Sequence, residues 1–228
     1  GGFDGYNIKE KDPFRNGVEG DDGLTSNRSE TGNAMYYSLA KAIDMTSDKE
    51  FIEFDVAAMP GVTVSALNQK LIDACEDRGD AIAIVDMAGG YKPSSENTDS
   101  ESDRVGSVSD TINNVKDMNI NSSYGCTFYP WVQIRDTQTD SVLYVPPSVV
   151  ALGTFSSSQR KSAVWFAPAG FTRGGLSEGS SGLPVLGVRQ RLTSTERDDL
   201  YEANINPIAS FPAEGIVIFG QKTLQVTQ

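Results

Sequence analysis

The sequence predicts an α/β domain in which a layered, mixed β-sheet is flanked by helices on both sides. Two apolar stretches typical of buried strands, residues 81–85 and 126–136, support this fold class. Between the expected strands, apolar residues recur at steps of three and four, which indicates amphipathic helices. With 228 residues, 38% of them hydrophobic, the chain can bury the core of one large domain.

The first sixty residues predict an irregular segment, then one helix and one strand. Residues 1–30 are rich in Gly, Asp and Asn without periodicity, so we expect an acidic loop region there. Residues 51–58 predict a strand that ends at Pro60 and Gly61. Residues 31–45 predict a helix that packs one face on the sheet, through Met35, Leu39, Ala42 and Ile43.

A βαβ unit is expected from residue 51 to residue 85. The second helix should be capped by Thr63 and stopped by Gly79, and its apolar face comprises Val64, Leu67, Leu71, Ile72 and Cys75. The unbroken apolar run 81–85 then predicts a strand covered on both faces. Strand, helix and strand in this order form a unit with a right-handed crossover.

Residues 87–106 interrupt this pattern with a polar, acidic insertion. The segment 94–103 is of low complexity, so we expect a mobile loop on the surface. A helix should follow, capped by Ser107 or Ser109, with its apolar face formed by Val108, Ile112, Val115 and Met118.

The most aromatic stretch, residues 126–136, predicts a long central strand that is broken or bent at Pro130. Proline cannot donate a hydrogen bond to a strand neighbour, so the bend should redirect Trp131. Residues 142–145 predict a second strand, and Pro146-Pro-Ser148 should begin a helix. Both tryptophans, Trp131 and Trp165, are expected in the core, and the alternative is that they stack on a ligand.

The C-terminal third predicts a loop, a helix and a hairpin. Residues 170–183 form a Gly/Ser-rich connection, and its segment 174–182 is expected to be a flexible surface loop. That segment lacks the Gly-Lys-Ser/Thr sequence of a phosphate-binding loop. Residues 193–196, Thr-Ser-Thr-Glu, have capping-box spacing and predict a helix. Residues 208–211 and 216–219 should form a hairpin.

The composition excludes several classes of function. The net charge is −12, from 31 acidic and 19 basic residues, which argues against nucleic-acid and anionic-membrane partners. No run of about 18 apolar residues could span a bilayer. Cys75 and Cys126 are expected to be buried, reduced thiols, with a disulfide between them as the alternative.

Catalytic chemistry is equally limited, because the chain contains no histidine. Asp86 ends a buried strand, where α/β enzymes often place an acid, but a Ser-His-Asp triad needs an imidazole. We therefore expect no catalytic residue, no cofactor and no metal site. Two carboxylate sets could in principle bind calcium, but neither has EF-hand spacing: Asp4, Asp21 and Asp22, or Glu96, Asp99 and Asp103.

Four phrases, in order and at their spacing, resemble the contractile tail sheath proteins of bacteriophages, the T-even-like group especially. They are Ser122-Ser-Tyr-Gly125, Tyr129-Pro-Trp131, Val145-Pro-Pro-Ser148 and Trp165-Phe-Ala-Pro-Ala-Gly170. The opening Gly1-Gly-Phe-Asp-Gly5 and the closing Asn206-Pro-Ile208 and Gly220-Gln-Lys-Thr-Leu224 add to the resemblance. It implies that residues 1–228 form the family's central, subtilisin-like domain without catalytic residues.

The resemblance also implies a structural function. Sheath subunits assemble as hexameric rings around a tail tube, and their contraction drives the tube through the host envelope. The implied partners are other sheath subunits, the tube protein and the baseplate, in a virion assembled in the host cytoplasm. We expect the N-terminal arm and the C-terminal, tube-facing domain to be absent from this chain.

Other functions remain open at this point. One is the sheath of a related injection device, such as a tailocin or a secretion system. Another is a hydrolase that uses carboxylates on an α/β scaffold. A third is a surface binding module, which would display an exposed aromatic patch.

Overall fold

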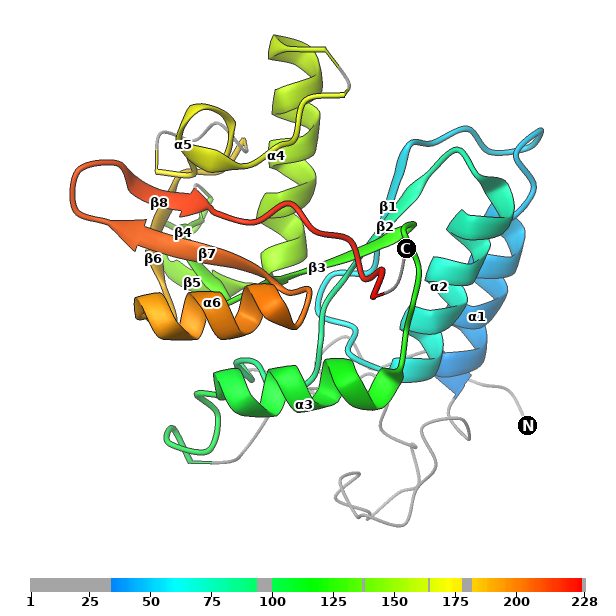
Figure 1. Ribbon diagram of the computed structural model, residues 1–228. Helices are drawn as coiled ribbons and strands as arrows, with labels where there is room; N and C mark the ends of the chain where they lie inside the picture. The colour runs from blue at the N-terminus through cyan, green and yellow to red at the C-terminus, as the bar shows by residue number, and fades with distance from the viewer. Residues whose placement is uncertain (1–33, 94–99, 137, 164, 178–181, 227–228) are drawn as a thin grey trace.

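A five-stranded mixed sheet runs through the centre of the molecule (Figure 1). The computed structural model describes residues 34–93, 100–136, 138–163, 165–177 and 182–226. The strand order is β1-β2-β3-β7-β8, and all neighbours are parallel except β7 and β8, which form the expected hairpin. The strands are β1 (Val56–Ala58), β2 (Ile82–Val85), β3 (Gly125–Tyr129), β7 (Asn206–Phe211) and β8 (Gly215–Ile218).

Helices cover both faces of this sheet, as expected. Helices α1 (Ala34–Thr46) and α2 (Ser65–Arg78) lie on one side and α4 (Pro147–Lys161) on the other (Figure 1). Alternate residues of β2 enter different cores: Ala83 and Val85 pack with α2, whereas Ile84 packs with α4. The strand is therefore buried on both faces, which explains its continuous apolar sequence.

A third, smaller core lies beneath the sheet, between α3 (Val108–Met118) and α6 (Ser194–Glu202). It contains the buried residues Val108, Tyr129, Leu192, Leu200 and Ile205. Each of the two helices begins at its expected cap. Ser107 accepts a hydrogen bond from the Asp110 amide, and Thr193 and Glu196 form a complete capping box.

A second sheet begins where the expected long strand breaks. The chain leaves β3 at Tyr129, passes through a cis peptide bond to Pro130, and enters β4 (Val132–Arg135) in a different sheet. This antiparallel sheet has the order β5-β4-β6, where β5 is Val142–Val145 and β6 is Val185–Val188. The break at Pro130 is confirmed, but a single strand over 126–136 was wrong.

Several local expectations need correction. Helix α2 has Val64 at its N-cap position without a side-chain hydrogen bond, so Thr63 does not cap it, although Gly79 ends it in the left-handed conformation. The first strand is only three residues long. Helix α1 packs mainly on α2 instead of on the sheet. The expected Gly/Ser loop is packed at its start, because Leu176 is buried and its amide donates to the carbonyl of Ile216 in β8.

Both cysteines are free and buried, as expected. Burial raises the pKa of the Cys75 thiol to about 11 and that of the Cys126 thiol to about 12. Within the described residues, no helix is both long and apolar enough to cross a bilayer. The acidic loop region 1–30 and residues 94–99 of the insertion lie outside the described residues.

Candidate functional site

The carboxyl end of the parallel strands is where open α/β sheets usually place ligand sites, and Asp86 lies there, directly after β2. Its carboxylate accepts three hydrogen bonds. Oδ2 accepts from the Gly61 amide at 2.9 Å and from the Ser148 hydroxyl at 2.6 Å, and Oδ1 accepts from the Ser148 amide at 3.2 Å. The backbone carbonyl of Asp86 accepts from the Asn68 side chain at 2.8 Å. One acid therefore connects the turn after β1, helix α2 and the start of α4.

Ser148 is the second residue of α4, so Asp86 caps this helix from a distant part of the chain. The helix's own N-cap, Pro146, makes no side-chain hydrogen bond. The first amides of a helix lack partners within the helix, and an anion at this end is stabilised by the helix dipole. Asp86 thus replaces the Ser, Thr or Asp that usually precedes a helix.

The electrostatics of Asp86 reflect two opposing effects. Burial, at 2% exposure, disfavours the charged form, and it outweighs the three hydrogen bonds, which favour that form. The pKa of the Asp86 carboxyl is therefore raised above its ordinary value of 3.8. A raised pKa and a short Oγ–Oδ2 distance are also features of catalytic pairs, so access to the pair decides its role.

The Asp86–Ser148 pair lacks two requirements of a serine hydrolase with a Ser-His-Asp triad. Ser148 has an exposed fraction of 0%, so a substrate carbonyl cannot reach its hydroxyl. The chain also has no histidine to shuttle the serine proton to a leaving group. The hydrogen bonds of the pair therefore support a structural role, in which it holds α4 to the sheet.

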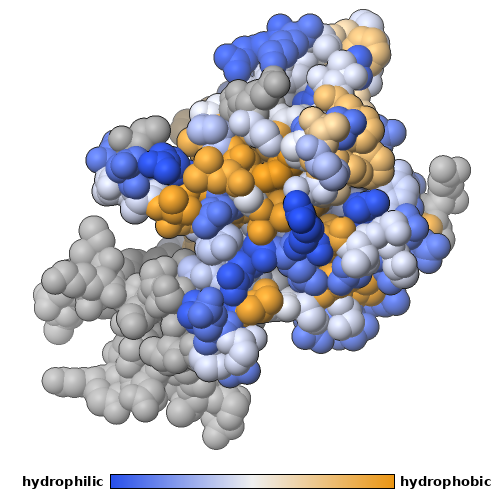
Figure 2. Space-filling view, turned by 90° about the vertical axis from the view of Figure 1, so that its left-hand side faces the viewer, coloured by the Kyte–Doolittle hydropathy of each residue, from blue (hydrophilic) through white to orange (hydrophobic). Residues whose placement is uncertain are grey.

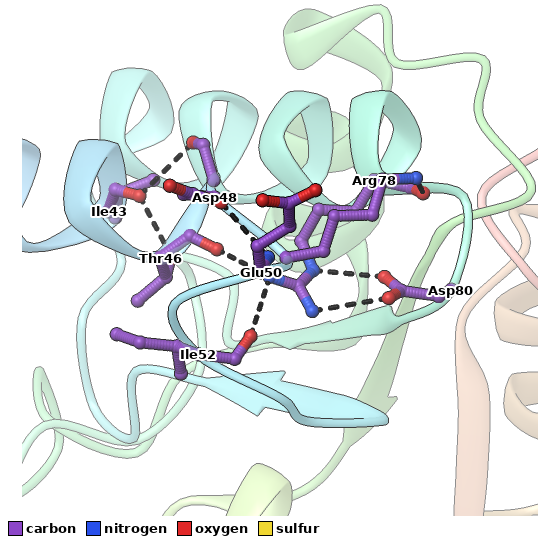
Figure 3. Close-up of polar contacts among 9 residues, drawn as sticks. Ile43, Thr46, Asp48, Glu50, Ile52, Arg78 and Asp80 are labelled. Atoms are coloured by element: carbon purple, nitrogen blue, oxygen red, sulfur yellow. Dashed lines mark hydrogen bonds and ion pairs between the residues drawn. The ribbon is translucent and has the colours of Figure 1, made fainter.

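A second buried charge, Arg78, holds the segment between α1 and β1 (Figure 3). Its guanidinium is 2% exposed and donates to the carbonyls of Thr46 at 2.8 Å and Ile52 at 3.0 Å. It forms a two-pronged ion pair with Asp80, at 2.9 and 3.2 Å, and lies 4.1 Å from the centre of the Phe54 ring. All of these partners are structural, so Arg78 fixes this loop and does not form a ligand site.

The two tryptophans have different environments. Trp131 is 7% exposed and packs edge-on against Tyr91, so its core position is confirmed. Trp165 is 80% exposed, so its expected core position was wrong. Phe166, Phe171 and other large hydrophobic side chains are also exposed. On the face that Figure 2 shows, hydrophobic residues gather in a patch. This patch is the feature that a binding surface would display.

Most of the carboxylates considered as possible calcium ligands lie outside the described residues. Asp4, Asp21 and Asp22 lie outside them, as do Glu96 and Asp99. Asp103 accepts a hydrogen bond from Ser100. Within the described part of the chain, no group of three or more carboxylate or thiol side chains could hold a metal ion.

The fold is an α/β domain in which the buried charged groups Asp86 and Arg78 hold helices and loops to the sheet. The chain belongs to the phage tail sheath protein family, because the family model for the phage tail sheath protein central domain matches residues 31–224. All described helices and strands, from Ala34 to Ile218, therefore fall within the matched region.

Three curated relatives are tail sheath proteins. That of Enterobacteria phage T4 is 25% identical over 88% of this chain, and that of Salmonella phage ViI is 28% identical over 68%. The tail sheath protein of Vibrio phage KVP40 is 30% identical over 48% of this chain. The chain spans 30%, 22% and 15% of the length of these relatives, respectively.

Two solved structures share the fold. One is the contracted helical sheath of the anti-feeding prophage, with a TM-score of 0.54 and 22% identity, and the other is the baseplate of the same particle, with 0.52 and 20%. Both matches cover 83% of this chain, and they cover 44% and 43% of the matched chains.

Proposed function

We propose that this chain is the central domain of a longer contractile sheath subunit, here called the complete subunit. The observation that carries the proposal is the family-model match over residues 31–224. The greater length of the three tail sheath relatives supports a larger subunit. In this role the domain is a structural component of the virion, assembled in the host cytoplasm, and has no enzymatic activity.

The complete subunits assemble as hexameric rings around a tail tube and contact the baseplate. Contraction changes the packing between subunits and drives the tube through the host envelope, with free energy stored in the subunit interfaces. The buried contacts of Asp86 and Arg78 support this mechanism, because they hold helices and loops to the sheet. A domain held in this way can move as a body between two arrangements.

The second candidate function is the sheath of a related injection device, such as a tailocin or a secretion system. The matches to sheath and baseplate chains of the anti-feeding prophage favour it. Both candidates assign the same mechanical role to this domain and differ only in the particle that carries it.

The test compares the isolated 228-residue chain with the complete subunit by sedimentation velocity and electron microscopy at matched salt. We expect the isolated chain to be a monomer, because its net charge of −12 makes copies repel each other at low salt. We expect the complete subunit to form rings or long tubes. A complete subunit that never polymerises would contradict the sheath function.

A further inference from the structure

A surface of exposed aromatic and basic residues, here called the aromatic–basic surface, lies after helix α4. It comprises Trp165, Phe166, Phe171, Arg173 and Phe219. The Arg173 guanidinium lies 4.1 Å from the centre of the Phe166 ring, and the rings of Phe171 and Phe219 are 5.6 Å apart. Exposed apolar surface of this kind marks an interface, and Trp and Arg are the residues most enriched at binding hot spots.

Basic residues outnumber acidic ones around this surface, where Lys161 and Arg173 line a hollow together with one carboxylate, that of Glu214. No Asp or Glu occurs between Asp140 and Glu178, whereas Arg160, Lys161 and Arg173 lie in this segment. Within the described part of the chain, none of these three residues forms an ion pair with a carboxylate. The partner that fits is therefore acidic and has an apolar centre.

A groove with that chemistry lies between α3 and α6. In Figure 1, α6 lies below β7 and α3 lies below α6, whereas α5 (Gly170–Arg173) lies above β8. The groove has a volume of about 660 Å³. Its lining combines apolar residues with three carboxylates and one ammonium group: Val108, Ile112, Ala203, Glu196, Asp199, Glu202 and Lys116.

We propose that the aromatic–basic surface of one copy docks into the α3–α6 groove of the next copy. The inference rests on the proposed sheath function and names two surfaces through which sheath subunits bind each other. A contact between unlike surfaces links copies head to tail, either in a closed ring or in an open helical stack. Trp165 supplies apolar area for the groove, and Arg173 supplies the opposite charge to Glu202.

A charge-exchange experiment in the complete subunit tests the contact. Arg173→Glu and Glu202→Arg should each raise the protein concentration needed for tube assembly by about tenfold, the usual effect of losing a hot-spot contact. The double variant with both changes should assemble close to the wild-type concentration. The matched control combines Arg173→Glu with Asp77→Arg, because Asp77 is exposed on α2 and does not line the groove. The control should not restore assembly.

Trp165 gives a second, independent measurement. The fluorescence of Trp165 is the difference between the wild type and the Trp165→Phe variant. Acrylamide should quench this fluorescence strongly in dissociated subunits and at least threefold less in tubes. Circular dichroism establishes that each variant is folded before it is compared.

Three results would overturn the docking proposal while leaving the sheath function intact. The first is that single charge variants assemble like the wild type. The second is that Trp165 is already protected in dissociated subunits, which assigns the surface to another part of the same subunit. The third is that Trp165 becomes protected only when tube or baseplate protein is added. If the wild-type complete subunit does not assemble at all, it is the sheath function that fails.

Discussion

Removal of the Asp86 carboxylate should destabilise the domain more than any other single change at the carboxyl end of the parallel strands. Asp86→Ala leaves the amides of Gly61 and Ser148 without acceptors inside a buried site. Each orphaned donor costs about 1 to 3 kcal/mol, and loss of the helix cap is part of this cost. The expected decrease in the free energy of unfolding is therefore on the order of 3 to 5 kcal/mol.

Urea denaturation of the isolated chain, followed by circular dichroism and fluorescence, measures this decrease. Asp86→Asn is the matched variant, because it keeps the size of the side chain and one acceptor oxygen. It should lose about 1 to 2 kcal/mol. If Asp86→Ala unfolds at the wild-type urea concentration, the carboxylate does not hold α4 to the sheet, and the case for a chemical role would have to be reopened.

Comparison of the wild type with Asp86→Asn also tests the raised pKa of the Asp86 carboxyl. In the folded state Asp86 keeps its proton to higher pH than in the unfolded state, so its contribution to stability falls as pH rises from about 4 through the folded pKa. The stability advantage of wild type over Asp86→Asn should therefore shrink as pH rises. Asp136 is the control with the opposite sign, because hydrogen bonds from Thr139 and Gln138 lower its pKa. The stability advantage of the wild type over Asp136→Asn should therefore grow as pH rises.

Three further changes have expected outcomes in the same denaturation assay. Trp131→Ala should cost about 3 to 5 kcal/mol because a buried ring is removed, whereas Trp165→Ala should stay within about 0.5 kcal/mol of the wild type. Arg78→Leu should cost about 2 to 4 kcal/mol because the partly buried carbonyls of Thr46 and Ile52 lose their donor, and an unchanged value would refute its structural role. Replacing residues 94–103 with a short Gly-Ser linker should lower the melting temperature by less than about 5 °C, and a larger decrease would show that this segment is packed.

Local patterns were sufficient where a single element buries one face or ends at a characteristic residue. The run 81–85 identified a strand covered on both faces, and Gly79, Ser107 and Thr193 marked helix ends correctly. These signals succeed because a cap depends on neighbours within a few residues, and because a strand buried on both faces is continuously apolar in its own sequence.

Signals that depend on distant residues could not be read in this way. Ser148 lies 62 positions beyond Asp86, so the tertiary cap leaves no local pattern. Strand β6 was missed because it is four residues long and contains Gly187, whose missing side chain leaves room for Gln133. Trp165 was misassigned because an apolar sequence is the same whether it fills a core or covers a partner.

The break at Pro130 also has a mechanical consequence. Only Pro130 and Trp131 separate β3 of the large sheet from β4 of the small one. The junction is clamped on both sides, since the Tyr129 hydroxyl donates to Gln190 and the Arg189 amide donates to the Trp131 carbonyl at 2.8 Å. Because the connection is short and hydrogen-bonded at both ends, it leaves little room for motion of one sheet relative to the other. We therefore expect a torque applied to β5 or β6 to rotate the small sheet and the parallel strands together, as one rigid unit.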